Sequence, residues 1–287
     1  MKKRIKKTFL IIAIVLVAGL VFLFTYVPSL PKQHGVVETL LYLGDSDNQP
    51  LIVAFGGAEG GIDWHRNHMK SKRDSLIQKG YAILAIGYFN ADGTPTNLDR
   101  ISLDAISDTI MNIAKNPKID DSKIALIGGS KGGELVLNLA SRFSQFKAVI
   151  AMSTSNVSFP AITLYSNTSS WTYKGNEVPY VPAPLKIISP ALKGDHYTAF
   201  SIMLEDEKAV KNAEIQVENI NGVILILSGK NDDQWPASEM SDQLIKRLKS
   251  KDFKYYNKHI KLDGGHIAPL EHFNIVYDFL DKYLPTK

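Results

Sequence analysis

Apolar runs alternate with amphipathic segments through most of the 287-residue chain, and this alternation limits the possible folds more than any other feature. Runs such as IALI, AVIAM and VILIL contain no polar residue, which is typical of strands that are covered on both faces. The segments between them repeat their apolar residues with helical spacing. The alternation predicts an α/β fold in which helices flank a mostly parallel sheet.

The pattern also predicts where the elements lie. The expected strands are 36–43, 51–55, 81–86, 123–127, 147–152, 223–227 and 256–262. The expected helices are 63–79, 101–116, 132–143, 236–250 and 270–283. The interval 153–220 breaks the rhythm because it is rich in Ser, Thr, Asn, Pro and Tyr, and it predicts at most one helix, near 197–212. Such an insertion at the carboxyl edge of a sheet is typical of a lid or cap over a substrate site.

The N-terminal segment predicts a location outside the cytoplasm for the body. No charged residue lies between Thr8 and Leu30, and at about 1.5 Å per residue a helix of this length covers a bilayer core of about 30 Å. Five basic residues precede it, namely Lys2, Lys3, Arg4, Lys6 and Lys7. Because positive charge favours the cytoplasmic side, we expect a basic cytoplasmic tail at 1–7 and a transmembrane signal anchor at 8–30 in the cell membrane. A cleaved signal peptide is the alternative, and it would release a secreted body.

Charge and cysteine content exclude several partners and sites. The chain carries 33 basic and 29 acidic residues, a net charge of +4, but the five basic residues of the tail leave 28 against 29 elsewhere. The body therefore lacks the excess of positive charge that would attract nucleic acid. The absence of cysteine excludes disulfides, thiolate zinc sites and a cysteine nucleophile.

We expect a linker and first strand at 31–50, followed by one domain at 51–287 that contains the insertion.

The strongest functional pattern is Gly128-Gly129-Ser130-Lys131-Gly132, which lies between an expected strand and an expected helix. A G-x-S-x-G turn needs glycines because a side chain on either flank would clash, and it raises a strained serine above the sheet. A phosphate-binding loop is the rival interpretation, but the G-K-[ST] ending and the wider glycine spacing are missing. The context predicts that Ser130 is a nucleophile.

A serine nucleophile needs a base, and on such a turn the partners follow in the order Ser, acid, His. Asp232 and Asp233 come directly after an expected late strand, and Asp232 is favoured by its Gly-x-x-Asp spacing, with Asp233 as the alternative acid. His266 follows the last expected strand in the run Asp263-Gly264-Gly265-His266. His259 lies within that strand and His272 on the last helix, where packing or solvent contact is expected. The spacing predicts a triad of Ser130, Asp232 and His266.

A glycine-rich loop after an expected early strand predicts an oxyanion hole. The run Phe55-Gly56-Gly57-Ala58-Glu59-Gly60-Gly61 can aim a backbone N–H at a developing oxyanion. Ala58 is the expected first donor, with Gly57 or Glu59 if the register differs by one residue. The Lys131 N–H is the expected second donor.

Two other groups of residues invite a functional interpretation. His65 and His68 would share a helix face, but no H-E-x-x-H motif is present, and we expect neither a metal nor a cofactor. Aromatic residues of the insertion either line an apolar acyl pocket or pack the insertion onto the body, and these are Tyr165, Trp171, Tyr173 and Tyr180.

Several motifs together resemble the catalytic domain of acyl-CoA thioesterases and bile acid-CoA:amino acid N-acyltransferases, within the α/β-hydrolase superfamily. The similar stretches are FGGAEGG, YAILAIGYFNADGTPTNLDRISLDAI, LIGGSKGGELVLNLAS, YKGNEVPYVP, LSGKNDDQWPASEMSDQLIKRL and LDGGHIAPL. The resemblance implies an α/β-hydrolase fold with Ser130 as nucleophile, an acid in the Asp232-Asp233 pair and His266 as base. The chain departs from that family in two ways. Residues 36–48 are too short for the N-terminal β-sandwich of those enzymes, and the body is expected outside the cell, where acyl-CoA is not found.

We therefore expect a serine hydrolase that cleaves an acyl ester or thioester of a small-molecule substrate through an acyl-enzyme. Two alternatives are left open. One is an acyltransferase that passes the acyl group to an amine or alcohol. The other is a catalytically dead surface binding protein on the same scaffold.

Overall fold

The computed structural model describes residues 2–165 and 167–286. Its main sheet has seven strands in the order β1-β3-β2-β5-β6-β9-β10. Antiparallel pairing occurs between β1 and β3, and the other neighbours in this sheet are parallel. The strands are β1 (Glu38–Tyr42), β2 (Gln49–Phe55), β3 (Ala82–Gly87), β5 (Ile119–Gly129), β6 (Phe146–Met152), β9 (Val223–Gly229) and β10 (Asn257–Leu262). The predicted α/β fold with a mostly parallel sheet is confirmed.

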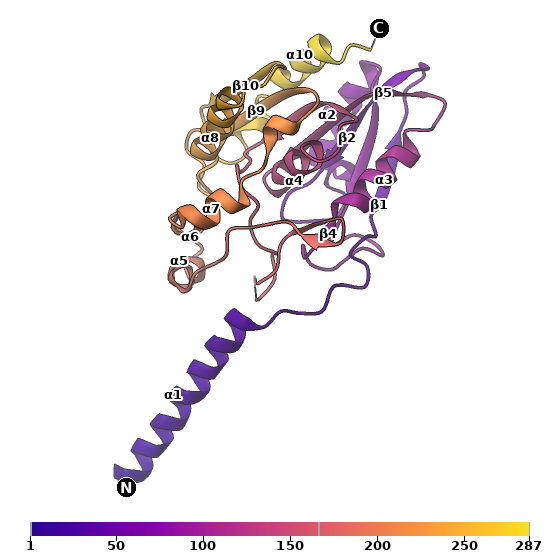
Figure 1. Ribbon diagram of the computed structural model, residues 1–287. Coiled ribbons are helices and arrows are strands. Elements are labelled where there is room, and N and C mark those ends of the chain that lie inside the picture. The colour runs from indigo at the N-terminus through magenta and orange to yellow at the C-terminus, as the bar shows by residue number, and fades with distance from the viewer. Residues whose placement is uncertain (1, 166, 287) are drawn as a thin grey trace.

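Helices cover both faces of this sheet (Figure 1). One face packs against α3 (Leu103–Ile113), α4 (Lys131–Ala140) and α8 (Ala237–Ser250). The other face packs against α2 (Asn67–Gln78), α9 (Ala268–Glu271) and α10 (Asn274–Tyr283). Strands β2, β3 and most of β6 are buried along their length, which explains why their sequences show no polar alternation.

Three expected helices are divided or shortened. The helix expected at 63–79 is a short 3-10 turn η1 (Asp63–His65) followed by α2, with Arg66 in extended backbone between them. The helix expected at 101–116 begins only at Leu103, because β4 (Ile101–Ser102) pairs with β7 (Trp171–Tyr173) and Ser102 caps the helix. The helix expected at 270–283 is divided into α9 and α10.

The insertion between β6 and β9 contains more helix than the sequence predicts. Besides η2 (Leu185–Ile187) and η3 (Val217–Asn219), it contains α5 (Ile188–Leu192), α6 (His196–Met203) and α7 (Glu207–Ala213). The expectation of at most one helix near 197–212 was therefore wrong. Asp195 and Asp206 accept hydrogen bonds from the Thr198 and Ala209 amides and start separate helices, a local capping signal that the polar composition concealed. Strands β7 and β8 (Asn176–Glu177) complete a small second sheet with β4.

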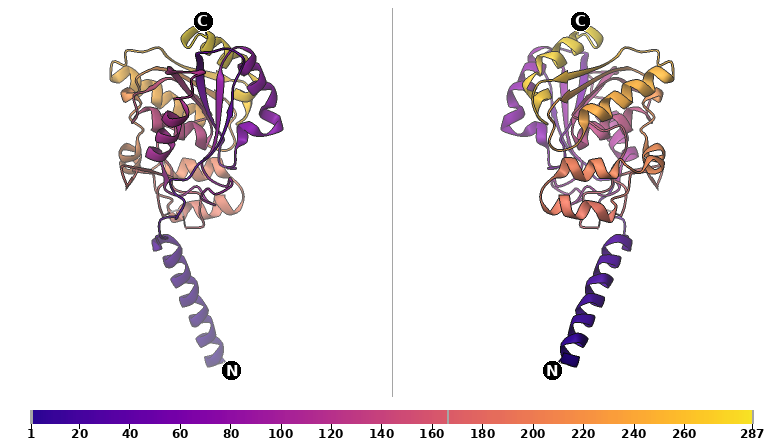
Figure 2. Two further views of the ribbon diagram at one scale, coloured as in Figure 1. Left: turned by 90° about the vertical axis from the view of Figure 1, so that its right-hand side faces the viewer. Right: turned by 90° about the vertical axis from the view of Figure 1, so that its left-hand side faces the viewer.

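The N-terminal helix α1 (Lys2–Thr25) extends away from the body, as both views of Figure 2 show. Its last turn contacts the body through Phe22, whose ring centroid lies 6.0 Å from that of Tyr165, and the next residue after the helix, Tyr26, lies 4.8 Å from the same ring. Within residues 2–165 and 167–286, no helix has the length and apolar character needed to cross a membrane. The predicted transmembrane anchor at 8–30 is therefore not supported. The predicted basic tail at 1–7 begins with Met1, which lies outside the described residues.

Candidate active site

The side chains predicted to be catalytic gather where four neighbouring parallel strands end. Strands β5, β6, β9 and β10 lie side by side, and parallel strands bring their carboxyl ends to one edge of a sheet. Ser130 follows β5, Ser153 follows β6, and Asp232 and His266 lie in the loops after β9 and β10. Residues more than a hundred positions apart in the chain thus share one edge, which is where open α/β sheets bind ligands.

The turn at Ser130 has the strained backbone expected of a raised nucleophile. Ser130 adopts φ 55° and ψ −122°, a conformation that costs a non-glycine residue about 1–3 kcal/mol. Its amide donates to the Met152 carbonyl oxygen at 2.8 Å, which fixes the turn to the end of β6. Helix α4 begins at the next residue, so the serine lies at the positive end of a helix dipole.

The flanking glycines of this turn are required by space. A Cβ on Gly128 would lie 2.2 Å from the Gly132 carbonyl oxygen. A Cβ on Gly132 would lie 2.4 Å from the Gly56 carbonyl oxygen. The second contact shows that the nucleophile turn packs directly against the glycine-rich loop after β2, so any side chain at Gly132 would separate the two.

The acid and the base predicted from sequence lie in contact. His266 Nδ1 is 2.8 Å from Asp232 Oδ2, and the Asp232 carboxylate is almost wholly buried. The other carboxylate oxygen, Oδ1, accepts from the Gln234 and Trp235 amides at 2.9 and 3.3 Å. Asp233 is exposed, and its Oδ1 accepts from the Gln234 side chain instead. This arrangement favours Asp232 as the partner that orients the imidazole.

The predicted contact between nucleophile and base is not formed. Among the described residues the structure contains no hydrogen bond from Ser130 Oγ to His266. The side chain of Ser130 is partly exposed at the carboxyl edge, and the His266 side chain retains access to solvent. Hydrogen bonds of this kind are often long without substrate and tighten when substrate binds, so the geometry leaves the serine free to meet a ligand.

The glycine-rich loop lies beside Ser130, as the oxyanion-hole prediction requires. A Cβ on Gly57 would lie 3.3 Å from Ser130 Cβ and 3.9 Å from Ser130 Oγ. The hydroxyl of the buried Tyr88 donates to the Gly56 carbonyl oxygen at 2.9 Å and lies 3.4 Å from that of Gly57. Ala58, the expected donor, is exposed, and within the described chain its amide donates no hydrogen bond. An N–H in this position is available to a ligand oxygen.

Sequence reasoning missed three residues that support this edge. Ser153 has a positive φ of 44°, and its Oγ donates to the His266 carbonyl oxygen at 2.7 Å. Trp235 donates from Nε1 to the Ser153 carbonyl oxygen at 2.9 Å. Tyr88 holds the glycine-rich loop as described above. The alternation pattern places all three at strand ends or in loops, and Tyr88 and Trp235 lie within stretches that carry the family resemblance.

The remaining sequence candidates lie elsewhere. His65 Nδ1 contacts the Tyr42 hydroxyl at 2.6 Å, and His68 Nε2 contacts Asp63 Oδ1 at 3.1 Å. In the described part of the chain, no group of three or more His, Cys, Asp or Glu side chains could hold a metal ion. Of the insertion's aromatic residues, Trp171 is fully buried, which favours packing over pocket lining for this side chain.

Residues 101–273 match the family described as "BAAT / Acyl-CoA thioester hydrolase C terminal", which is 60% of the chain's length. The chain belongs to this family. The matched region begins at β4 and includes the nucleophile turn, the insertion, Asp232 and His266. The resemblance predicted from the motifs is thus confirmed at the level of the family.

Named relatives agree with this assignment. The chain is 28% identical over 233 residues to acyl-coenzyme A thioesterase 1 of Mus musculus, covering 80% of this chain and 51% of that protein. It is 27% identical over 225 residues to the mitochondrial acyl-coenzyme A thioesterase 2 of Homo sapiens, covering 77% of this chain and 43% of that protein. The chain therefore spans about half the length of these BAAT / acyl-CoA thioester hydrolase relatives.

Solved structures confirm the α/β-hydrolase fold. A puromycin-hydrolyzing peptidase of Mycobacterium tuberculosis superposes with a TM-score of 0.59 at 14% identity, covering 88% of this chain and 38% of that one. An acetyl xylan esterase from Paenibacillus sp. R4 superposes with a TM-score of 0.56 at 15% identity, covering 86% of this chain and 79% of that one. At these identities the likeness concerns the fold alone.

Proposed function

We propose that the protein is a serine hydrolase that cleaves acyl thioesters or esters, with an acyl-CoA thioesterase-like specificity for the acyl group. The observation that carries the proposal is the Asp232–His266 contact at 2.8 Å, at the same sheet edge as a strained serine. The family and its thioesterase relatives support the same chemistry. The glycine-rich loop packed against the serine turn supports acyl transfer over simple binding.

The proposed reaction uses each group in one role. Ser130 Oγ attacks the acyl carbonyl carbon while His266 Nε2 accepts the hydroxyl proton. Asp232 holds Nδ1 of the imidazole and stabilises the imidazolium that forms. The Ala58 and Lys131 amides donate to the oxyanion. His266 returns the proton to the leaving thiolate or alkoxide, and water then releases the acid from the acyl-enzyme by the same steps.

Apolar side chains near His266 support an acyl substrate. Ile267 directly follows the base and is exposed, and the Trp235 ring lies against the His266 ring with centroids 6.3 Å apart. An apolar margin beside the acid–base pair suits a hydrocarbon chain better than a charged group. In this proposal, the segment 153–220 acts as a lid or cap that bounds the acyl chain.

The location of the protein is a separate proposal. We propose that the N-terminal segment exports the body from the cytoplasm, because five basic residues precede an uncharged run from Thr8 to Leu30. Cell fractionation with a cytoplasmic marker tests this, and the intact mass of the exported chain shows whether the segment is cleaved. Recovery of the full-length chain with the cytoplasmic marker would contradict it.

The decisive experiment combines labelling with a substrate series. We expect a fluorophosphonate to modify Ser130, detected by peptide mass spectrometry, and acyl-CoA and p-nitrophenyl esters of graded chain length to be hydrolysed. Conjugates formed with added amines or alcohols, in place of free acid, would identify an acyltransferase. A chain that is folded but unlabelled and inactive on every ester would show a binding protein on a hydrolase scaffold.

A further inference from the structure

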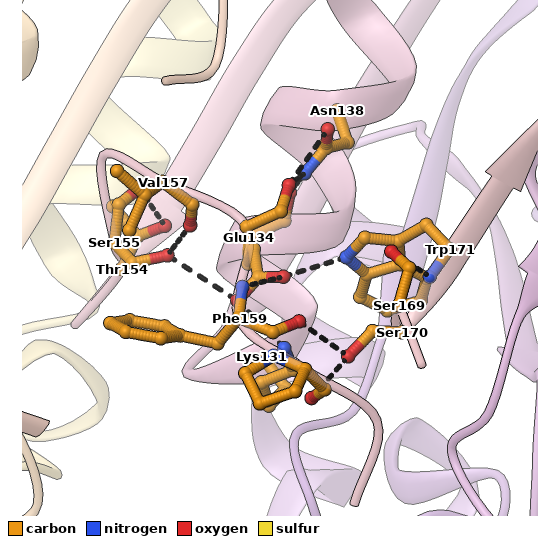
Figure 3. A network of polar contacts seen from close by, with 12 residues as sticks. Lys131, Glu134, Asn138, Thr154, Ser155, Val157, Phe159, Ser169, Ser170 and Trp171 are labelled. Carbon is orange, nitrogen blue, oxygen red and sulfur yellow. Dashed lines mark hydrogen bonds and ion pairs between the residues drawn. The ribbon is translucent and has the colours of Figure 1, made fainter. Parts of the chain in front are cut away.

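A buried carboxylate lies directly behind the nucleophile turn and has no role in the proposed reaction. Glu134 is on the first turn of α4 and is fully buried. Its Oε2 accepts from Lys131 Nζ at 2.7 Å, and its Oε1 accepts from Trp171 Nε1 at 2.7 Å and from the Phe159 amide at 3.2 Å (Figure 3). The Ser155 hydroxyl lies 3.4 Å from Oε2. One carboxylate thus contacts the residue after the nucleophile and three residues of the insertion.

Glu134 joins the two ends of a loop of the insertion. Phe159 and Trp171 are twelve positions apart in the chain, and both donate to the same oxygen, Oε1. Ser170 Oγ donates to the Phe159 and Pro160 carbonyl oxygens and so keeps the two ends together. One turn further along α4, the Asn138 side chain donates to Ser158 Oγ at 3.0 Å. The polar side chains of Glu134 and Asn138 therefore hold this loop against α4, the helix that begins directly after Ser130.

The contacts of Glu134 reach both expected oxyanion donors. Lys131 supplies one donor through its own amide, and its side chain is held by Glu134 and lies over the Trp171 ring at 5.4 Å. The Trp171 ring in turn packs against Tyr88, with centroids 5.8 Å apart. Tyr88 donates to the Gly56 carbonyl oxygen in the loop that precedes Ala58. One buried group therefore supports both sides of the oxyanion hole.

Stability alone does not explain this ion pair. Burial lowers the pKa of the Lys131 ammonium, an effect that the Glu134 charge opposes. A buried ion pair is often no more stabilising than apolar residues of the same volume. The ion pair is therefore weak evidence for a role in stability.

We propose that Glu134 is a positioning residue that sets the orientation of the oxyanion donors by holding the Lys131 side chain and by tying Ser155, Phe159 and Trp171 to α4. The inference rests on the proposed hydrolase function. Glu134 touches no reacting atom, so its effect falls on the rate of acyl transfer and leaves ground-state binding almost unchanged. A displacement of donors by about 1 Å is enough to slow such a reaction by about 100-fold.

The test compares three variants with the wild-type full chain. Glu134→Gln keeps the shape and the Oε1 acceptor but leaves the Lys131 ammonium without its counter-charge. Lys131→Met combined with Glu134→Gln removes both charges and restores electrical balance. Glu218→Gln is the matched control, because it breaks the ion pair of Glu218 with Arg247 outside the site. For each protein we measure kcat, KM, the rate of fluorophosphonate labelling at Ser130 and the thermal midpoint.

We expect Glu134→Gln to lower kcat and the labelling rate by about 10–100-fold with KM within about threefold, which is less than the loss of a whole donor. The double variant should recover its thermal midpoint but stay at least about tenfold below wild type in kcat. The Glu218→Gln control should lose stability without losing kcat. A double variant within twofold of the wild-type kcat would overturn the inference, because it would show that only the unpaired charge mattered. A wild-type chain that is not labelled at Ser130 would overturn the proposed function itself, and the inference with it.

Discussion

Two histidine–aspartate pairs belong to neighbouring parts of the chain, yet they differ in what they can do. His259 in β10 bonds Asp242 through Nδ1 at 3.0 Å and Ser228 Oγ through Nε2 at 2.7 Å, so a complete Ser–His–Asp chain of hydrogen bonds is formed. His266, seven positions later, bonds only Asp232 of the predicted triad. The more complete chain of hydrogen bonds is the one whose serine is fully buried.

The surroundings explain the difference. Ser228 is fully buried inside strand β9 and also contacts Ser238 Oγ at 2.9 Å. Ser130 is partly exposed on a strained turn at a helix N-terminus, beside a glycine-rich loop. A nucleophile needs an accessible oxygen and donors for the oxyanion as well as a base. Hydrogen bonding among the three side-chain types is therefore a poor criterion when it is used alone.

The largest expected effect separates the two serines. Ser130→Ala should reduce kcat on p-nitrophenyl esters by about 10⁴-fold or more, because in the proposed mechanism no other group forms the acyl-enzyme. Ser228→Ala should leave kcat within about threefold but lower the free energy of unfolding by about 1–3 kcal/mol, since His259 and Ser238 lose a buried partner. Steady-state kinetics and thermal unfolding of both variants check this. Equal losses of kcat in the two variants would show that the comparison is wrong.

A smaller but still large effect should separate the acids. Asp232→Asn should lower kcat by up to about 10⁴-fold, because an amide stabilises the wrong imidazole tautomer. Asp233→Asn and Asp242→Asn are the matched controls, and each should stay within about threefold of wild type. The measurement is kcat at saturating substrate. If Asp233→Asn were the more damaging change, the assignment of the orienting acid would have to be exchanged.

The smallest expected effect concerns the pH dependence of stability. Burial lowers the pKa of His259, while the contact with Asp242 opposes the shift. A folded-state pKa below the unfolded value of about 6.5 means that the contribution of His259 to stability is fully present above pH 6.5. This contribution is lost as the pH falls through the folded-state pKa.

Thermal midpoints between pH 7.5 and 5 should therefore fall more steeply for the wild type than for His259→Gln. Other titrating groups are common to both proteins and cancel in the difference. Parallel curves for the two proteins would contradict a buried neutral His259.

The sequence predicted much of the fold and site where the deciding interactions are local. The turn at Ser130 could be predicted because its G-x-S-x-G pattern is local and the crowding at Gly128 comes from Gly132, four positions later. The crowding at Gly132 comes from Gly56 in another loop, and the pattern does not reveal that contact. The helices of the insertion were missed although their capping residues Asp195 and Asp206 act within three positions, because a single capping residue is a weak signal in a polar segment. The contacts of Glu134 with Phe159 and Trp171 join residues 25 and 37 positions apart, and no periodicity in the sequence records them.

By itself, the sequence determined the α/β class, the order of its elements and the residue types able to act as nucleophile, acid and base, because apolar periodicity and steric limits are properties of short stretches of chain. Tertiary structure decided which carboxylate meets His266, which serine stays accessible and which groups support the glycine-rich loop. The physical reason is that these choices depend on the packing of β5, β6, β9 and β10 side by side. The sequence favoured the Ser130 grouping through its G-x-S-x-G turn, and the structure adds the physical difference: Ser228 is buried in the sheet, whereas Ser130 is partly exposed on a strained turn at the sheet edge.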